Sequence, residues 1–377
     1  MDRRKFLASG ICATACLLCR NDMLMAGIRG FSDLPPGNPL WKWSREAYHY
    51  KVTPRGVECT NCPNQCTLKR METSKCRNRI NVNDKLYSMA YGNPCAVHID
   101  PIEKKPFFHF LPSSQAFSIA TAGCNFACLN CQNWEISQKS PKETENLDLM
   151  PEEVVDACIK NNCESIAYTY SEPTVFYEYV HDTARIARAN GIKNVYKSNG
   201  YINEQPLRMQ SKYLDAANID LKGFTEDIYL KLNSGKLAPV LRTLQVLKEE
   251  GVWLEITNLV IPSWNDDMKT IRDMCKWLVA NKMDDNPLHF SRFTPLYKLT
   301  QLPATPLLTL QKARETALNE GMKYVYIGNL PGSDFENTTC PKCGKTVVER
   351  KGFRVIQNNI ISGKCKFCSV RIAGVWE

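Results

Sequence analysis

The sequence predicts an α/β protein: a partial (β/α)6-type barrel between an N-terminal cysteine-rich module and a C-terminal zinc-ribbon-like module. Two observations lead to this prediction. Strand-like and helix-like segments alternate through residues 113–332, and repeated βα units form a parallel sheet with crossover helices. One group of cysteines lies before that stretch and another lies after it. The predicted division of the chain is 1–26, 27–112, 113–332 and 333–377.

The composition is that of a globular protein with an unusual number of cysteines. Of 377 residues, 44% are hydrophobic and 23% are charged, which excludes a disordered chain and a multi-span membrane protein. The longest apolar run, 10–18, is shorter than the roughly 20 residues of a spanning helix. The net charge is +9, but the basic residues are scattered, so nucleic acid is not favoured as a partner. The 18 cysteines indicate metal ligation or disulfides.

The first residues resemble a targeting signal. Arg3 and Arg4 precede a short apolar run, as in twin-arginine signals, which export proteins already folded. This pattern predicts a signal over residues 1–26 and a periplasmic location. An ordinary basic start of a cytoplasmic enzyme is the alternative.

The elements of the barrel follow in chain order. Strands are expected at 116–121, 165–170, 193–197, 216–221, 253–260, 289–294 and 324–327, and helices at 151–160, 176–190, 240–250, 268–280 and 310–320. Several helices end at a glycine, as C-terminal caps favour. At roughly 30 residues per βα unit, the stretch holds six or seven units rather than the eight of a complete barrel.

The sharpest functional signal is a loop of three cysteines directly after the first barrel strand. The spacing of Cys124, Cys128 and Cys131 lets three sulfurs converge on one cluster. A four-iron cluster normally takes four thiolates, so three leave one iron open, and an open position is what chemistry at a metal requires. Barrel enzymes keep their active sites in loops at the carboxyl ends of strands. A partly used zinc site or buried free thiols are the alternatives.

At this loop the sequence resembles the radical S-adenosylmethionine (radical SAM) superfamily, whose signature is C-x3-C-x2-C. Residues 117–138 resemble the AmmeMemoRadiSam-system radical SAM enzymes, relatives of pyruvate formate-lyase activating enzyme, as do 98–106, 168–174, 217–223 and 289–295. The resemblance spans about residue 50 to the end. It implies a 4Fe-4S cluster and S-adenosyl-L-methionine (SAM). It also implies a ferredoxin- or flavodoxin-like electron donor, and Memo-like and AMMECR-like proteins as partners.

The resemblance implies a reaction as well. The reduced cluster passes an electron to SAM, which splits into methionine and a 5′-deoxyadenosyl radical that abstracts hydrogen from a substrate. Because SAM carries the chemistry, the protein positions it and tunes the cluster. The sequence identifies neither the substrate nor a separate catalytic residue.

SAM contacts are implied at the ends of successive strands. Glu172 stands where the family keeps a Gly-Gly-Glu-like motif for the methionine amino group, although Ser171-Glu172 departs from the two glycines. The same residues would also suit a helix N-cap. Ser198 and Asn199 suit a ribose or the methionine carboxylate, or simply form a turn.

Four further residues complete the implied SAM site. Asp220 and Lys222 point to the same face and match an Asp-Leu-Lys that contacts SAM in the relatives, with an ordinary ion pair as the alternative. Glu255 resembles the segment beside adenine, and His289 resembles a histidine near the adenosyl group; plain core residues are the alternative for both. Tyr168, Tyr170 and Arg292 are expected to line the substrate cavity or to serve as packing.

Two further cysteine sets predict closed metal sites. Cys340, Cys343, Cys365 and Cys368 follow the zinc-ribbon pattern, with disulfides or an iron–sulfur cluster as alternatives. The set Cys59, Cys62, Cys66 and Cys76 suits zinc or an auxiliary iron–sulfur cluster, and Cys95 could replace one ligand. Cys158, Cys163 and Cys275 are expected to be core thiols.

Two other functions remain open. One is a glycyl-radical activating enzyme that acts on a protein partner. The relatives with two extra ferredoxin-like clusters place those cysteines after the radical loop, whereas here they lie before it and at the far end. The other is a zinc-only binding protein.

Overall fold

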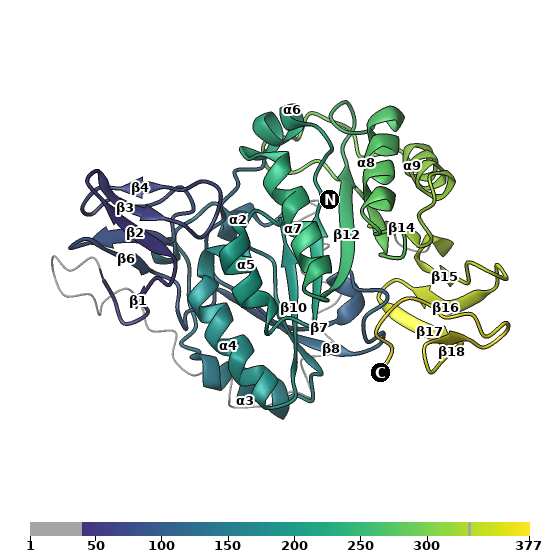
Figure 1. The fold of residues 1–377 in the computed structure, drawn as a ribbon, viewed down its shortest axis with the longest axis horizontal. Coiled ribbons are helices and arrows are strands. Elements are labelled where there is room, and N and C mark those ends of the chain that lie inside the picture. Colours follow the sequence, from purple (N-terminus) through teal and green to yellow (C-terminus); the bar gives the residue numbers. More distant parts are fainter. Residues whose placement is uncertain (1–39, 331–332) are drawn as a thin grey trace, which may run out of the picture.

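An eight-stranded sheet forms the centre of the computed structural model, which describes residues 40–330 and 333–377 (Figure 1). Its strand order is β14-β13-β12-β11-β10-β9-β8-β7. Neighbouring strands from β8 to β14 are parallel, whereas β7 is antiparallel to β8. The predicted α/β partial barrel is confirmed, with seven parallel strands where the six-unit type has six. The predicted export signal lies outside the described residues.

The sheet strands agree with the sequence prediction to within two residues at each end, apart from β7, which was not predicted. They are β7 (Ala96–Pro101), β8 (Gln115–Ala120), β9 (Ser165–Tyr168), β10 (Lys193–Ser198), β11 (Ala216–Asp220), β12 (Trp253–Val260), β13 (Leu288–Arg292) and β14 (Val325–Gly328).

The long helices cover the outer face of the sheet. They are α3 (Pro151–Lys160), α4 (Tyr177–Ala189), α5 (Glu204–Ser211), α7 (Leu237–Glu249), α8 (Met268–Ala280) and α9 (Leu307–Asn319). Short helical turns are α2 (Trp134–Ser137), α6 (Glu226–Ile228), the 3₁₀ turns η2 (Ile102–Lys104), η3 (Pro141–Glu143), η4 (Pro173–Phe176) and η6 (Asp334–Glu336), and the π-helical turn η5 (Tyr229–Asn233). Among the described residues, no helix is both long and apolar enough to cross a membrane.

The helices begin and bury their apolar faces for local reasons. In α3, Pro151 occupies the first turn, where a missing N–H costs nothing, and Val154 and Val155 are buried against the sheet. In α8, the Asp267 side chain accepts a hydrogen bond of 2.8 Å from the Thr270 amide, which satisfies one of the free N–H groups at a helix start.

Residues 102–111, which we call the plug segment, fill the inner face of the sheet where its strands begin. Three large apolar side chains of the segment, Ile102, Phe107 and Phe110, are buried there. They contact small residues of β8 to β11, namely Ala116, Ala167, Val195 and Ala216. The end of the barrel opposite the cysteine loop is therefore packed with side chains.

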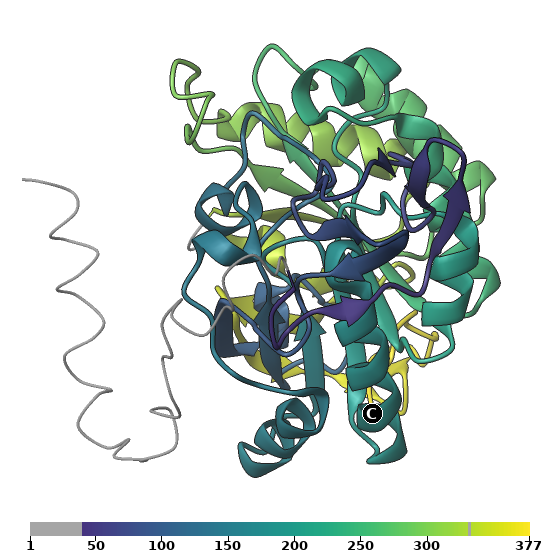
Figure 2. The same ribbon diagram turned by 90° about the vertical axis from the view of Figure 1, so that its left-hand side faces the viewer.

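The N-terminal module consists of two small antiparallel sheets. One contains β1 (Arg45–Glu46), β5 (Arg79–Val82) and β6 (Lys85–Ser88), and the other contains β2 (Tyr50–Thr53), β3 (Gly56–Cys59) and β4 (Thr67–Leu68). The module lies at one side of the barrel in Figure 1, and Figure 2 looks onto it. Its Arg79 forms an ion pair of 2.6 Å with Glu178 of α4, and both side chains are at most 2% exposed.

The C-terminal module, residues 333–377, lies on the opposite side of the barrel (Figure 1). It contains β15 (Thr338–Thr339), β16 (Thr346–Lys351), β17 (Arg354–Asn358), β18 (Ile360–Ile361) and β19 (Lys364–Cys365). Arg350 donates a 2.6 Å hydrogen bond to the Phe108 carbonyl. Val375 pairs through its backbone with His109 and Leu111, at 2.8 Å each. The module therefore holds the plug segment from outside.

Replacing Glu178 by glutamine should lower the free energy of unfolding by about 3–5 kcal/mol, because the buried Arg79 charge would lose the carboxylate that pairs with it. Urea denaturation of the metal-loaded protein measures this. The matched control is Arg208→Ala: Arg208 also contacts several glutamates, but it is about one-third exposed, so its loss should cost less than about 1 kcal/mol. Equal effects of the two substitutions would contradict the expectation.

Candidate functional site

The loop of three cysteines begins at Gly123, three residues after β8 ends. Gly123 has a φ of +100°, and a Cβ there would lie 2.6 Å from the Cys76 carbonyl oxygen of the N-terminal module. Both the backbone conformation and the close approach therefore require glycine. Cys124 is partly buried, Cys128 is 9% exposed and Cys131 is partly buried.

Neighbouring asparagines position the cysteine loop. Asn199, at the end of β10, donates to the Cys124 sulfur at 3.8 Å and to the Asn125 side chain at 2.9 Å. On the other side, Asn233 of η5 donates to the Cys128 sulfur at 3.1 Å. The backbone of the loop also pairs with η5, with Ala127 N bonded to Asn233 O at 3.1 Å. The loop is thus held by two barrel elements that follow it in the chain.

The electrostatics of the loop are those of thiols kept from water. Burial raises the pKa of Cys124, and the Glu172 carboxylate raises it further. Burial also raises the pKa of Cys128, while the Lys222 ammonium acts to lower it. In the absence of a metal these thiols are protonated near neutral pH, so binding a metal must release protons.

The three sulfurs lie near one another without forming a compact single-ion group. Each thiol interacts electrostatically with another member of the trio. Within residues 40–330 and 333–377, however, only the C-terminal cysteines bring three or more metal-binding atoms within 4.8 Å of one another. Since thiolates of an iron–sulfur cluster bind different irons, wider spacing is expected for them. The residues therefore fit a four-iron cluster held by Cys124, Cys128 and Cys131.

Glu172 connects the ends of β9 and β10 next to Cys124. Its Oε1 accepts hydrogen bonds from Thr174 N at 3.0 Å and from the Ser198 hydroxyl at 2.8 Å, and its Oε2 accepts one from Asn199 N at 2.8 Å. Glu172 also serves as the N-cap of η4, so the alternative that the sequence offered is present. The structure brings Glu172, Ser198 and Asn199 together beside the cysteine loop.

Asp220 and Lys222 form the ion pair expected of residues on one face, at 2.9 Å. Lys197 of β10 is a second cation on the same carboxylate. Burial acts to raise the pKa of Asp220, but the two lysines outweigh it and lower that pKa to about 2. The Asp220 carboxylate is therefore ionised at neutral pH between the two lysines, although burial lowers the pKa of Lys197, and both Asp220 and Lys222 interact electrostatically with Cys128.

Glu255 and His289 lie together, but their partners belong to the packed end of the barrel. Their side chains are 2.7 Å apart, and both residues are at most 2% exposed. Glu255 also accepts hydrogen bonds from the backbone N–H groups of Phe108 and His109, at 2.8–3.0 Å. The Glu255 carboxylate thus already has hydrogen-bond partners in the plug segment and in β13. This matches the alternative that Glu255 and His289 are core residues rather than SAM contacts.

The three residues expected around a substrate cavity lie in different places. Tyr168 is fully buried in the core between sheet and helices, and its hydroxyl donates to Asn194 at 3.0 Å; for Tyr168 the expectation of a cavity position is wrong, because its side chain points to the helices. The Tyr170 hydroxyl bonds Asp100 of β7. Arg292 donates to the Thr305 carbonyl at 3.0 Å.

The C-terminal cysteines form a compact set. The sulfurs of Cys340, Cys343, Cys365 and Cys368 all lie within 4.8 Å of one another. The pairs Cys340–Cys368 and Cys343–Cys365 are 3.6 Å and 3.8 Å apart. Four sulfurs at about 2.3 Å from one tetrahedral zinc lie about 3.8 Å apart, whereas a disulfide joins its sulfurs at about 2.0 Å. This group could hold a metal ion.

Of the N-terminal cysteines, Cys59 ends β3 and the other three lie in loops of the same module, which contacts the trio. Cys59 and Cys76 are buried, and Cys62 and Cys66 are partly exposed. Each of the predicted core thiols, Cys158, Cys163 and Cys275, is at most 4% exposed; this prediction is confirmed.

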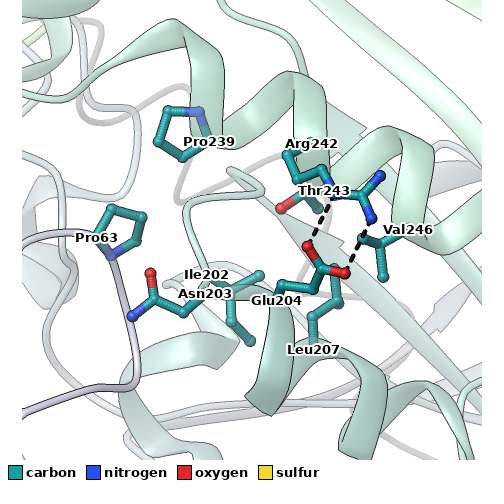
Figure 3. Close-up of a pocket in the computed structure, with 9 residues that line it drawn as sticks. All are labelled: Pro63, Ile202, Asn203, Glu204, Leu207, Pro239, Arg242, Thr243 and Val246. Carbon is teal, nitrogen blue, oxygen red and sulfur yellow. Dashed lines mark hydrogen bonds and ion pairs between the residues drawn. The ribbon is translucent and has the colours of Figure 1, made fainter.

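A small pocket lies outside the barrel, between the N-terminal module and helices α5 and α7 (Figure 3). Pro63 lies across it from Arg242, which pairs with Glu204 at 2.9 Å. The remaining lining residues are Ile202, Asn203, Leu207, Pro239, Thr243 and Val246. None of the predicted site residues lines this pocket.

Sequence reasoning missed the residues that support the site. Asn125, Asn233 and Lys197 make its hydrogen bonds and its second ion pair. Asn125 lies inside the cysteine loop but is not part of its three-cysteine signature, whereas Lys197 belongs to an ordinary strand and Asn233 to a segment without any recognised motif. One signal was available for Asn233: it precedes Ser234-Gly235, and a Cβ on Gly235 would collide with the Phe126 ring of the loop. A close approach of this kind marks a glycine with a packing role.

Replacing Asn233 by alanine should lower the activity by about 10–100-fold, the usual cost of removing a group that bonds a metal ligand. Iron content should stay unchanged, and the reduction potential of the cluster should fall, because hydrogen bonds to the sulfurs help set it. Potentiometric titration followed by EPR measures this shift. Asn190→Ala is the control, since that exposed amide bonds only within its own helix. An unchanged potential in Asn233→Ala would contradict the expectation.

The chain is similar in sequence to several known proteins. A family model described as the radical SAM superfamily matches residues 118–275. An uncharacterized protein of Methanocaldococcus jannaschii is 47% identical over 331 residues, which are 87% of this chain and 98% of that protein. The pyruvate formate-lyase 1-activating enzyme of Escherichia coli (strain K12) is 26% identical over 151 residues, 38% of this chain and 61% of that enzyme. The chain thus spans less than two thirds of the latter.

Among solved structures, a radical SAM methyltransferase from Sphaerobacter thermophilus is similar, with a TM-score of 0.46 and 12% identity. The match covers 58% of this chain and 67% of that chain. Streptococcus suis SuiB bound to S-adenosylmethionine gives a TM-score of 0.45 and 13% identity, over 60% of this chain and 53% of that one.

Proposed function

Because this chain belongs to the radical SAM superfamily and is an enzyme of that type, we propose that it cleaves SAM reductively and uses the resulting radical to abstract hydrogen from a substrate. One observation carries the proposal. Three thiols of a single loop lie beside polar residues at the ends of β9, β10 and β11, which is where this fold class gathers its active-site groups.

Each part of the site has a task in this proposal. Cys124, Cys128 and Cys131 hold a four-iron cluster and leave one iron without a protein ligand. When bound there and reduced, the cluster supplies the electron that splits SAM into methionine and a 5′-deoxyadenosyl radical. Asn199 and Asn233 hold two of the sulfurs in place, and an external ferredoxin- or flavodoxin-like protein provides the electron.

The polar residues suit the methionine end of SAM. Oε2 of Glu172 accepts one hydrogen bond and has room for a second, which an ammonium group could donate. Lys197 and Lys222 share one carboxylate, so the excess positive charge beside Cys128 suits a carboxylate of the ligand. Ser198 uses its hydroxyl to fix Glu172, which makes it a positioning residue.

Anaerobic reconstitution with iron and sulfide tests the function. The reduced protein should form 5′-deoxyadenosine from SAM, and its EPR signal should change when SAM is added. A zinc-only binding protein would show neither the iron–sulfur absorption nor the nucleoside, and that result would refute the proposal.

A glycyl-radical activating enzyme is the second candidate, supported by the partial match to the pyruvate formate-lyase 1-activating enzyme. The two candidates differ in the final acceptor of the radical. With SAM and a protein partner that carries deuterium on glycine, an activating enzyme would transfer that deuterium into 5′-deoxyadenosine. Memo-like and AMMECR-like proteins are the first partners to test, with mass spectrometry of all products.

We also propose that the C-terminal cysteines bind zinc, because the sulfur spacings of 3.6 Å and 3.8 Å suit one tetrahedral ion. For residues 1–26 we propose twin-arginine export. Changing Arg3 and Arg4 to lysine should then retain the protein in the cytoplasmic fraction, and an unchanged distribution between fractions would refute export.

A further inference from the structure

The four N-terminal cysteines lie near one another. Cys59 ends β3 and its N–H bonds the Cys66 carbonyl at 3.0 Å, which joins two of the cysteines through the backbone. The Cys62 thiol interacts electrostatically with the other three thiols. Cys76 enters from the next turn, where the Ser74 hydroxyl lies 3.0 Å from its sulfur. Cys95, the fifth cysteine, lies just before β7 and its side chain bonds Thr144 instead.

The spacing of these sulfurs differs from that of a single-ion site. The C-terminal set provides an internal standard, because its sulfurs all lie within 4.8 Å of one another. In residues 40–330 and 333–377, no three of the N-terminal sulfurs meet that criterion. The trio of the active site does not meet it either, and it is the set that fits an iron–sulfur cluster. The N-terminal set is therefore not a compact single-ion group, and in this respect it resembles the active-site trio, whose thiolates would bind different irons of one cluster.

A buried positive charge lies near two of the four cysteines, Cys59 and Cys76. The Arg79 side chain is 2% exposed, and it interacts electrostatically with Cys59 and Cys76. Its Nη1 pairs with Glu178, but its buried Nη2 has no hydrogen-bond partner in the described part of the chain. Leaving such a donor unsatisfied is costly, and sulfur atoms of a negatively charged cluster would provide an acceptor for it.

The four cysteines also lie against the loop of the first cluster. The carbonyl of Cys76 is in close contact with Gly123, which precedes Cys124. Asn64 and Asn78 of the module donate to the carbonyls of Asn125 and Ala122, at 2.8 Å and 2.9 Å. The two sets of cysteines are therefore joined by direct contacts between their loops.

We propose that Cys59, Cys62, Cys66 and Cys76 hold a second four-iron cluster, closed by four thiolates and adjacent to the cluster of the active-site loop. With all four irons ligated by cysteine, this cluster has no open position for SAM. It goes beyond the radical reaction itself, since neither the three-cysteine loop nor the family model over residues 118–275 accounts for it.

The full-length variant Cys124→Ala/Cys128→Ala/Cys131→Ala, reconstituted anaerobically, isolates the second site. We expect about four irons and about one zinc per chain, against about eight irons in the unaltered protein. After reduction the variant should give an EPR signal that SAM does not change. Two zinc ions and no iron, or no metal beyond the C-terminal zinc, would overturn the proposal.

A further substitution, Cys62→Ala, in the same background locates the iron. The iron content should fall to near zero while the single zinc remains, and retention of the iron would overturn the assignment to these cysteines. If this variant fails to fold, Mössbauer counting of irons in the unaltered protein still decides between about eight and about four. The triple variant lacks the active-site cysteines, so this test can succeed even if the proposed radical chemistry is wrong. Likewise, the radical chemistry can be correct even if this test shows no second cluster.

Discussion

Cys128→Ala should abolish the formation of 5′-deoxyadenosine, with a loss of at least about a thousand-fold, because enzymatic accelerations are typically ~10⁶ or more. Cys128 is the most deeply buried residue of the three cysteines, and Asn233 donates a hydrogen bond to its sulfur. With only two thiolates left in the loop, the cluster has no secure attachment. Product analysis by mass spectrometry and iron counting measure the effect together.

The matched control for this variant is Cys158→Ala. Cys158 is fully buried in α3 and bonds only nearby carbonyl groups, so its loss should affect stability slightly and leave SAM cleavage intact. If Cys128→Ala still produced 5′-deoxyadenosine at the normal rate, the cluster would not be held by this loop. If both variants lost activity alike, the effect would come from the fold.

Cys365→Ser should release the C-terminal metal and unfold residues 333–377. Structural zinc contributes on the order of 10 kcal/mol to the folding of small modules, and Cys365 is one of the two buried ligands of its set. The module also packs Phe108 and Tyr326 into its own apolar cluster. We therefore expect the loss of structure to extend to the plug segment and to lower the temperature of the thermal unfolding transition of the barrel as well.

Zinc analysis, calorimetry and limited proteolysis measure the result. The control is Lys342→Ala, an exposed residue between Cys340 and Cys343, which should keep the metal and the transition temperature. A Cys365→Ser protein that has lost its metal but melts at the normal temperature would show that the module folds without the ion.

The barrel could be predicted well because its signals are local. Seven apolar strand segments alternate with amphipathic helices, and each predicted strand agrees with an observed one to within two residues. Strand β7 was missed because its residues, Ala96–Pro101, include a histidine and an aspartate, and the partner that makes them a strand, β8, follows later in the chain. Helix α5 was missed because Pro206 lies inside it.

The parts of the site that depend on the spacing of metal ligands along the chain could be predicted, and the parts whose positions depend on tertiary contacts could not. The cysteine sets depend on short intervals along the chain. The positions of Glu255 and His289 depend instead on the plug segment, which lies more than a hundred residues away in sequence. Backbone amide groups of that segment donate hydrogen bonds to the Glu255 carboxylate. Tyr168 illustrates the same limit, because alternation along a strand does not reveal which face meets the helices.

Ile102, Phe107 and Phe110, packed near the starts of four strands, close that end of the interior of the partial barrel. A long molecule cannot be threaded through it lengthwise. In the proposed reaction, substrate and product therefore reach and leave the cysteine loop at the other end of the strands or through the open side of the partial barrel.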